Sequence, residues 1–133
     1  MKAQIEFDNG ATLTFSPADL FFALPVETLT GYAENSFQAT LTGGVVILNQ
    51  ADGGGSFGLA APVAFADDGA RLLVVNAAPQ PADVRSDAGG GFGGNVGTNT
   101  ATLAGRTGCL LLVAAGGAWH VAKSDGASFW QGE

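Results

Sequence analysis

The sequence predicts an all-β protein, an antiparallel β-sandwich or barrel-like domain with an N-terminal β-hairpin and one short helix. From Phe37 onward the chain consists of short apolar segments separated by glycine-rich turns, which the 21 glycines in 133 residues supply. A chain of this length is expected to bury one modest core. We expect residues 1–30 to form the hairpin and helix, as an arm or subdomain, and residues 31–133 to form the sandwich-like domain.

The N-terminal segment has the clearest strand pattern. Apolar and polar residues alternate over 3–7 and again over 11–15, and Asp8-Asn9-Gly10 lies between the two runs. A three-residue loop that ends in glycine fits a type I turn followed by a left-handed residue. The pattern therefore predicts an antiparallel hairpin with one apolar face.

A short helix is expected next. Ser16 is suited to cap it, Pro17 to its first position and Asp19 to its first turn, and Pro25 ends it. One or two helical turns cannot bury all of the large apolar residues on one side, so either the hairpin or a second subunit covers them. These residues are Leu20, Phe21, Phe22 and Leu24.

The remaining strands follow a common pattern. Residues 37–41 alternate like a half-buried strand, whereas 45–48 form a continuous apolar run, typical of a strand covered on both faces. Glycine followed by branched apolar residues recurs at 69–76 and at 108–113. Because the spacings differ, the segments share a role without forming a strict repeat. They indicate strands stacked in a sandwich or a short coil.

The last third predicts a buried strand over 108–114, a tight turn at 115–118 and a second strand opened by Trp119. Ser124-Asp125-Gly126 predicts another turn, which would make 118–122 and 127–131 a final hairpin.

Residues 77–99 are predicted to form a projecting loop, because its prolines and glycines disfavour a strand. Phe92 is the one bulky side chain of its glycine-rich part. It is expected either to tuck back as a plug or to contact a neighbouring molecule.

Charge excludes several partners. The net charge is −7, and the five Lys and Arg residues are scattered singly. Binding to nucleic acid or to an anionic membrane needs clustered positive charge, so neither partner is expected.

The N-terminus has no apolar signal-peptide region, and the longest apolar stretch is too short to span a bilayer. Cys109, the only cysteine, lies in an apolar run and is expected to be a small buried hydrophobe.

The motifs that could indicate catalysis or ligand binding are better explained as ordinary structural elements. Gly54-Gly55-Ser56-Phe57-Gly58 matches the spelling of a nucleophile elbow, but Pro62 prevents the long helix that such an elbow requires. Two glycine patterns of the dinucleotide type, at 53–58 and 89–94, do not open a helix. Asp67-Asp68-Gly69 is expected to be a turn, and His120 to be exposed or at an interface. No enzymatic activity, cofactor or metal is therefore expected.

Aromatic residues are the other candidates for binding. Tyr32, Trp119, Phe129 and Trp130 could stack on sugars, which makes a carbohydrate-binding module one alternative function. Such a module needs two or more exposed aromatics in a row on one face. Burial is expected for Trp119, and an interface position for Phe129 and Trp130 near the C-terminus.

Residues 45–123 carry a family resemblance. The segments 98–104, 108–113 and Gly116-Gly117-Ala118-Trp119-His120-Val121, with the upstream segments 59–62 and 68–76, resemble the end of many tailed-bacteriophage virion proteins. Such domains occur in head fibres, capsid decoration proteins and tail-fibre or tailspike tips. The resemblance implies a homotrimer and no enzymatic residues. The leading segment, Met1 to Pro25, departs from it.

Because the chain is too short for a fibre with a shaft, the resemblance favours a capsid decoration (cement) protein, made in the host cytoplasm and bound to the major capsid protein on the virion. A tail, baseplate or fibre subunit is a second alternative. The residues expected at protein interfaces are Phe15, Leu20, Phe21, Phe22, Phe92, Phe129 and Trp130.

Overall fold

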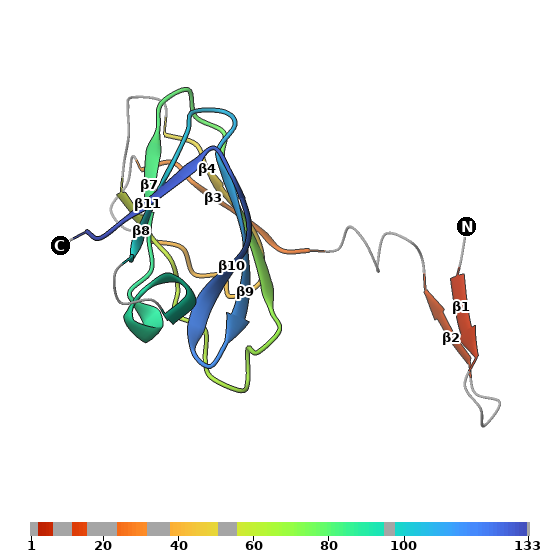
Figure 1. The fold of residues 1–133 in the computed structure, drawn as a ribbon. Coiled ribbons are helices and arrows are strands. Elements are labelled where there is room, and N and C mark those ends of the chain that lie inside the picture. The colour runs from red at the N-terminus through yellow and green to blue at the C-terminus, as the bar shows by residue number, and fades with distance from the viewer. Residues whose placement is uncertain are drawn as a thin grey trace.

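The computed structural model describes residues 3–6, 12–15, 24–31, 38–50, 56–94 and 98–132. At its start, β1 (Ala3–Glu6) and β2 (Thr12–Phe15) form an antiparallel two-stranded sheet (Figure 1). Ala3 pairs with Phe15 and Ile5 with Leu13, so the predicted hairpin is confirmed. Neither strand pairs with any other described strand. The predicted helix falls almost wholly on residues 16–23, which lie outside the described residues.

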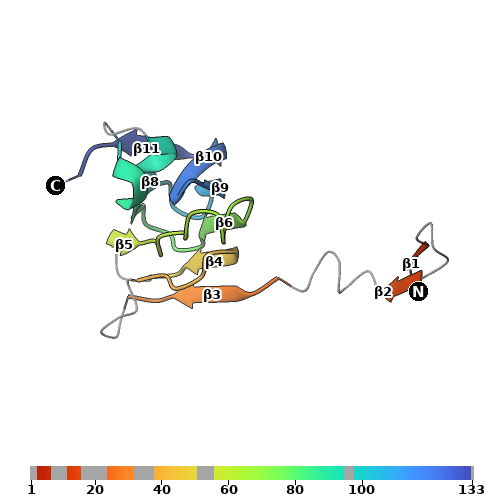
Figure 2. The ribbon, with the colours of Figure 1, turned by 90° about the horizontal axis from the view of Figure 1, so that it is seen from below.

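Two sheets form the body, and Figure 2 shows them side by side. The five-stranded sheet has the order β10 (Ala118–Asp125), β9 (Cys109–Ala115), β6 (Arg71–Asn76), β4 (Gly44–Leu48) and β3 (Val26–Leu29). The four-stranded sheet has the order β11 (Ala127–Trp130), β8 (Thr100–Leu103), β7 (Ala82–Arg85) and β5 (Ser56–Gly58). The all-β sandwich is confirmed, and the sheets do not close into a barrel. Because β3 pairs with β4, the larger sheet begins before residue 31.

The sheets are mixed, so the predicted sandwich contains parallel strand pairs beside the expected antiparallel ones. β3, β4 and β6 run parallel to one another, and β5 runs parallel to β7. The chain alternates between the sheets from β3 to β7, touching the smaller sheet first through a parallel bridge between Gln38 and Gly58. Successive parallel strands in one sheet are thus joined through the other, as in a short coil. Of the strand predicted over 37–41, the described part holds only this bridge.

The three glycine-led apolar segments become β4, β6 and β9, which are neighbours at the centre of the larger sheet. Their residues alternate between buried and half-buried positions. Val46 and Leu48 face the core, whereas Val45 and Ile47 stay partly exposed. The prediction that 45–48 is covered on both faces is therefore wrong for this chain taken alone.

The described part of 77–99, residues 77–94 and 98–99, does not form a projecting loop. β7 lies within this segment and pairs with both β5 and β8, and two 3-10 turns follow, η1 (Ala88–Gly90) and η2 (Phe92–Gly94). Phe92 is 4% exposed. Phe92 was expected either to tuck back as a plug or to contact a neighbouring molecule, and in the structure it tucks back into the core. The strand Ala-Asp-Val-Arg is only four residues long, and pairing on both edges stabilises it despite the prolines before it.

The hairpin of β9 and β10 is confirmed, with Gly116 and Gly117 at φ 61° and 82° in its turn. Positive φ at both central residues is what a type I′ turn requires. The predicted final hairpin is wrong. β10 pairs with β9 and β11 pairs with β8, so the chain crosses from one sheet to the other at Gly126. The sequence pattern predicted that β11 would pair with β10. In the structure β11 pairs with the edge of β8 instead.

The core lies between the sheets, and Trp119 is its largest fully buried side chain. The Trp119 indole N–H donates a 2.9 Å hydrogen bond to the carbonyl of Ala60, so burial leaves no unpaired donor. The predicted core position of Trp119 is confirmed.

Candidate functional site

The outer face of the five-stranded sheet is apolar across its centre. Strand register places Val45 beside Leu73 and Leu73 beside Leu111 in one row. Ile47, Val75 and Cys109 form the next row. All of these side chains are half-buried, because neighbours on the same sheet face shield one another. With Val113 they define the apolar face: Val45, Ile47, Leu73, Val75, Cys109, Leu111 and Val113.

Polar and exposed residues border the apolar face. On β10, His120, Lys123 and Asp125 pair with Val113, Leu111 and Cys109. On β3, Val26 is 60% exposed and pairs with Val45. Figure 2 shows no strand or helix of the described chain lying over the central strands on this side. An apolar centre with a polar rim is the usual anatomy of a protein interface.

The outer face of the four-stranded sheet is polar. Register aligns Ser128 with Thr102, Thr102 with Asp83, and Asp83 with Ser56. Trp130, Thr100 and Arg85 form the neighbouring row. Core residues alternate with these on every strand. The polar face is therefore defined by Ser56, Asp83, Arg85, Thr100, Thr102, Ser128 and Trp130.

Trp130 has a fixed orientation on the polar face. Its indole N–H donates a 2.9 Å hydrogen bond to Oγ1 of Thr102, and this hydroxyl donates a 2.6 Å bond to Oδ1 of Asp83. The indole of Trp130 therefore leans across β8. Its side chain is held by this relay while the residue stays 44% exposed.

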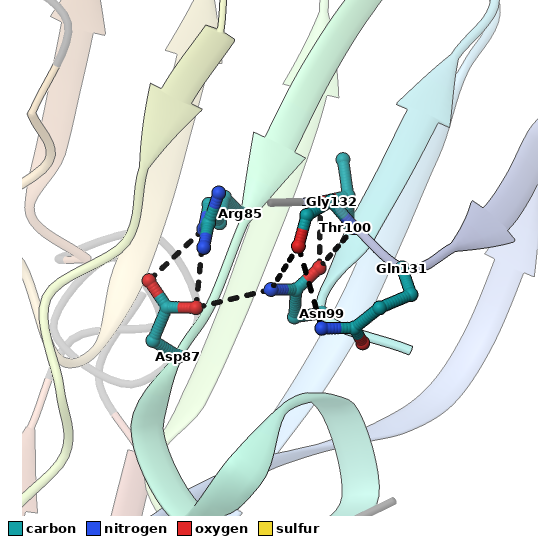
Figure 3. A network of polar contacts seen from close by, with 6 residues as sticks. All are labelled: Arg85, Asp87, Asn99, Thr100, Gln131 and Gly132. Atoms are coloured by element: carbon teal, nitrogen blue, oxygen red, sulfur yellow. Dashed lines mark hydrogen bonds and ion pairs between the residues drawn. The ribbon is translucent and has the colours of Figure 1, made fainter. Parts of the chain in front are cut away.

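A polar clamp fixes the end of β11 next to Trp130 (Figure 3). Oδ1 of Asn99 accepts a 2.7 Å bond from the N–H of Gly132, and Nδ2 of Asn99 donates to the Gly132 carbonyl at 3.2 Å. Nδ2 also donates to Asp87, whose carboxylate pairs with Nε of Arg85 at 3.0 Å. A Cβ on residue 132 would lie 2.6 Å from Oγ1 of Thr100, so a larger residue here would have to displace this hydroxyl.

A hydrogen-bonded loop presents Phe65, which is 90% exposed. Phe65 has a φ of 68° and is the centre of a turn in which the Ala66 N–H donates to the Ala64 carbonyl at 2.8 Å. Such a turn is rare and strained for a side-chain-bearing residue. Asp67 accepts from the N–H of Val63, and Asp68 accepts from the N–H of Phe65. The prediction that the two aspartates form a turn is confirmed.

A shallow depression of about 460 Å³ lies beside η2. Phe92 and Phe129 line it, and their rings meet edge to face with centroids 5.8 Å apart. His120 and Val121 form another part of its wall. His120 is exposed, and its Nε2 lies 3.2 Å from the carbonyl of Ala115.

The motifs considered for catalysis lie on ordinary elements. Ser56 opens β5, so a strand and not a helix follows it. Residues 89–94 lie in 3-10 turns. Among the described residues, no group of three acidic, histidine or cysteine side chains is arranged to hold a metal ion. None of the helical turns in the described part of the chain has the length and apolar character that crossing a membrane requires.

Of the predicted interface residues that the structure describes, Phe92 and Phe129 meet each other and pack inward, whereas Trp130 faces outward. Phe15 lies in β2, and Leu20, Phe21, Phe22 and Tyr32 fall outside the described residues. Sequence reasoning missed the apolar face and Phe65. The signal for the face was present, because its strands are continuous apolar runs in which the outward positions are as apolar as the inward ones.

No protein-family model matches the chain, and no curated protein sequence matches it either.

Proposed function

We propose that this protein is a non-enzymatic structural protein of a tailed-phage virion, a homotrimeric decoration protein that binds the major capsid protein. The apolar face of the five-stranded sheet is the observation that carries the proposal. An apolar surface of this kind, rimmed by polar residues, marks a protein interaction site.

The strand sequences support a covered face. Near-continuous apolar runs are typical of strands buried on both sides. Here the core covers one side of β4, β6 and β9, and the other side carries Val45, Leu73 and Leu111. A second chain, either another copy or a shell protein, supplies the missing cover.

The hairpin of β1 and β2 supports the same proposal. Each of its strands has four residues, and the hairpin pairs with neither sheet of the body. An isolated two-stranded hairpin is marginally stable in water, so a surface on another chain would stabilise it. The resemblance of residues 45–123 to phage virion proteins supplies the virion setting.

The experiment compares association of two variants with that of the unmodified protein. Leu73→Lys with Leu111→Lys places two charges on the apolar face, and sedimentation is expected to show a monomer where the unmodified protein forms a trimer. Ser128→Lys, on the outer face of the other sheet, is the matched control and is expected to remain a trimer. Circular dichroism checks that both variants fold.

Binding to purified shells that lack a decoration protein tests the capsid role. The unmodified protein is expected to bind the shells, and the double-lysine variant to bind at least tenfold more weakly. A clean monomer at micromolar concentration that does not bind shells would overturn the proposal. Binding to purified tails in place of heads would assign the protein to the tail or baseplate.

A further inference from the structure

We infer that the polar face of the four-stranded sheet binds a neutral saccharide, with Trp130 as the platform on which one sugar ring stacks. The inference does not depend on the proposed capsid role. It rests on an exposed indole of fixed orientation that lies beside a row of hydroxyl and carboxylate groups.

Trp130 has the properties of a stacking platform. The residue is 44% exposed, and the bond from its Nε1 to Oγ1 of Thr102 restricts rotation of the ring. The Asn99–Gly132 clamp holds the backbone just beyond it. The C–H groups on one side of a pyranose form an apolar surface that packs on an indole. A ring that is already ordered loses little side-chain entropy when the sugar binds.

Hydrogen-bonding groups lie next to the platform. Asp83 accepts the Thr102 hydroxyl through Oδ1 only, which leaves its second carboxylate oxygen for a sugar hydroxyl. Ser128 and Ser56 are exposed in the same row. Neighbouring strands lie about 4.8 Å apart, so the row spans the width of two or three sugar units.

The charges favour a neutral ligand. Arg85 pairs with Asp87, and Asp83 adds a further carboxylate, so a phosphate or sulfate would meet net negative charge. A protein partner is disfavoured because interface cores are depleted of charged groups, whereas this face has one indole among polar side chains. Among the described residues this face has one exposed aromatic, not the two or more in a row expected of a carbohydrate-binding module, so binding at each site is weak and affinity is gained when several copies bind together.

The test follows the two indole N–H signals by NMR in the full chain. The probes are the methyl β-glycosides of glucose and galactose and the trisaccharide of N-acetylglucosamine. At least one probe is expected to shift the Trp130 signal with a dissociation constant of about 1 mM, a free energy of about −4 kcal/mol. The Trp119 signal is expected to stay in place, because that ring is fully buried.

Three variants and a control define the site. With binding followed at the backbone amide signals of Thr102 and Ser128, Trp130→Ala is expected to weaken binding at least tenfold, and Asp83→Asn and Thr102→Val several-fold each. Phe65→Ala removes a more exposed aromatic that lies outside the face and is expected to leave binding unchanged. An unchanged Trp119 signal verifies that each variant folds.

Two results would overturn the inference. One is the absence of any shift at Trp130 with all three probes at roughly fifty times the expected dissociation constant. The other is a shift that persists in Trp130→Ala at signals elsewhere in the protein. If Trp130→Ala instead abolishes self-association and no probe binds, the polar face is a contact between copies.

Discussion

The two outer sheet faces have opposite chemistry, although residues at the centre of both are half-buried. Val45, Leu73 and Leu111 on one face are half-buried, and so are Asp83, Arg85 and Thr102 on the other. Half-burial therefore reflects shielding by neighbours on a sheet and not cover by another element. The difference between them lies in the residue types, which are the basis of the two proposals above. One sandwich thus presents an apolar face and a polar face in different directions.

Trp119 in the core and Trp130 on the polar face are expected to show the largest difference in their contribution to stability. Trp119→Ala is expected to lower the free energy of unfolding by about 3–5 kcal/mol, because it empties the core. Trp130→Ala is expected to cost about 1 kcal/mol, since it removes one hydrogen bond at a partly exposed position. Urea unfolding measures both values. Equal costs would show that Trp130 is as structural as Trp119.

Hydroxyl groups placed on the apolar face would make it resemble the polar face. Leu73→Thr with Val75→Thr is expected to raise the dissociation constant of the oligomer about a hundredfold, or about 2.7 kcal/mol. Threonine retains strand propensity, so the monomer is expected to fold. Analytical ultracentrifugation over a concentration series measures the constant. Unchanged association would move the interface away from this face.

The reverse change on the polar face provides the control for that experiment. Ser128→Val adds an apolar side chain to the outer face of β11 and is expected to leave the dissociation constant within about twofold, since exposed substitutions have small effects.

Removing the Asn99–Gly132 clamp tests how much this clamp contributes to the stability of the protein. Asn99→Ala is expected to lower the free energy of unfolding by about 1–3 kcal/mol, because it leaves the buried N–H of Gly132 without a partner. Gln131→Ala removes one longer bond to the Gly132 carbonyl, from an exposed residue, and is expected to have a much smaller effect. Thermal unfolding followed by circular dichroism compares the two. An unchanged free energy of unfolding in Asn99→Ala would show that the clamp adds nothing to stability.

Phe65 lies on neither face and gives the smallest expected effect. Phe65→Gly is expected to raise the free energy of unfolding by about 1 kcal/mol, because glycine adopts a positive φ without the steric cost of a Cβ. Phe65→Val keeps an apolar side chain but is β-branched, so it is expected to destabilise the loop. A loss of stability in Phe65→Gly would contradict the assignment of strain to this residue.

Much of the fold was predictable because local patterns determine strands and tight turns. The hairpins at 3–15 and 109–125, the central strands and the core position of Trp119 all follow from alternation, apolar runs and glycine placement. Partner choice was not predictable in the same way. Alternation cannot show whether β11 pairs with β10 or β8, or that β4 and β6 are parallel, because these pairings join distant segments.

The candidate sites were less predictable than the fold. An outward-facing polar row becomes visible only once β11, β8, β7 and β5 are in register. Phe92 and Trp130 were both expected at an interface, yet one fills the core and the other lies on the surface. Their sequence contexts do not distinguish these outcomes, since each is an aromatic residue next to small or polar ones.

The alternation of the chain between the sheets has a consequence for folding. Since β3, β4 and β6 are each followed by a segment in the other sheet, neither sheet can assemble from a continuous piece of chain. The body therefore has a high contact order, which predicts slow folding. It is also expected to unfold as one cooperative unit, so both tryptophans would report a single transition at the same denaturant concentration.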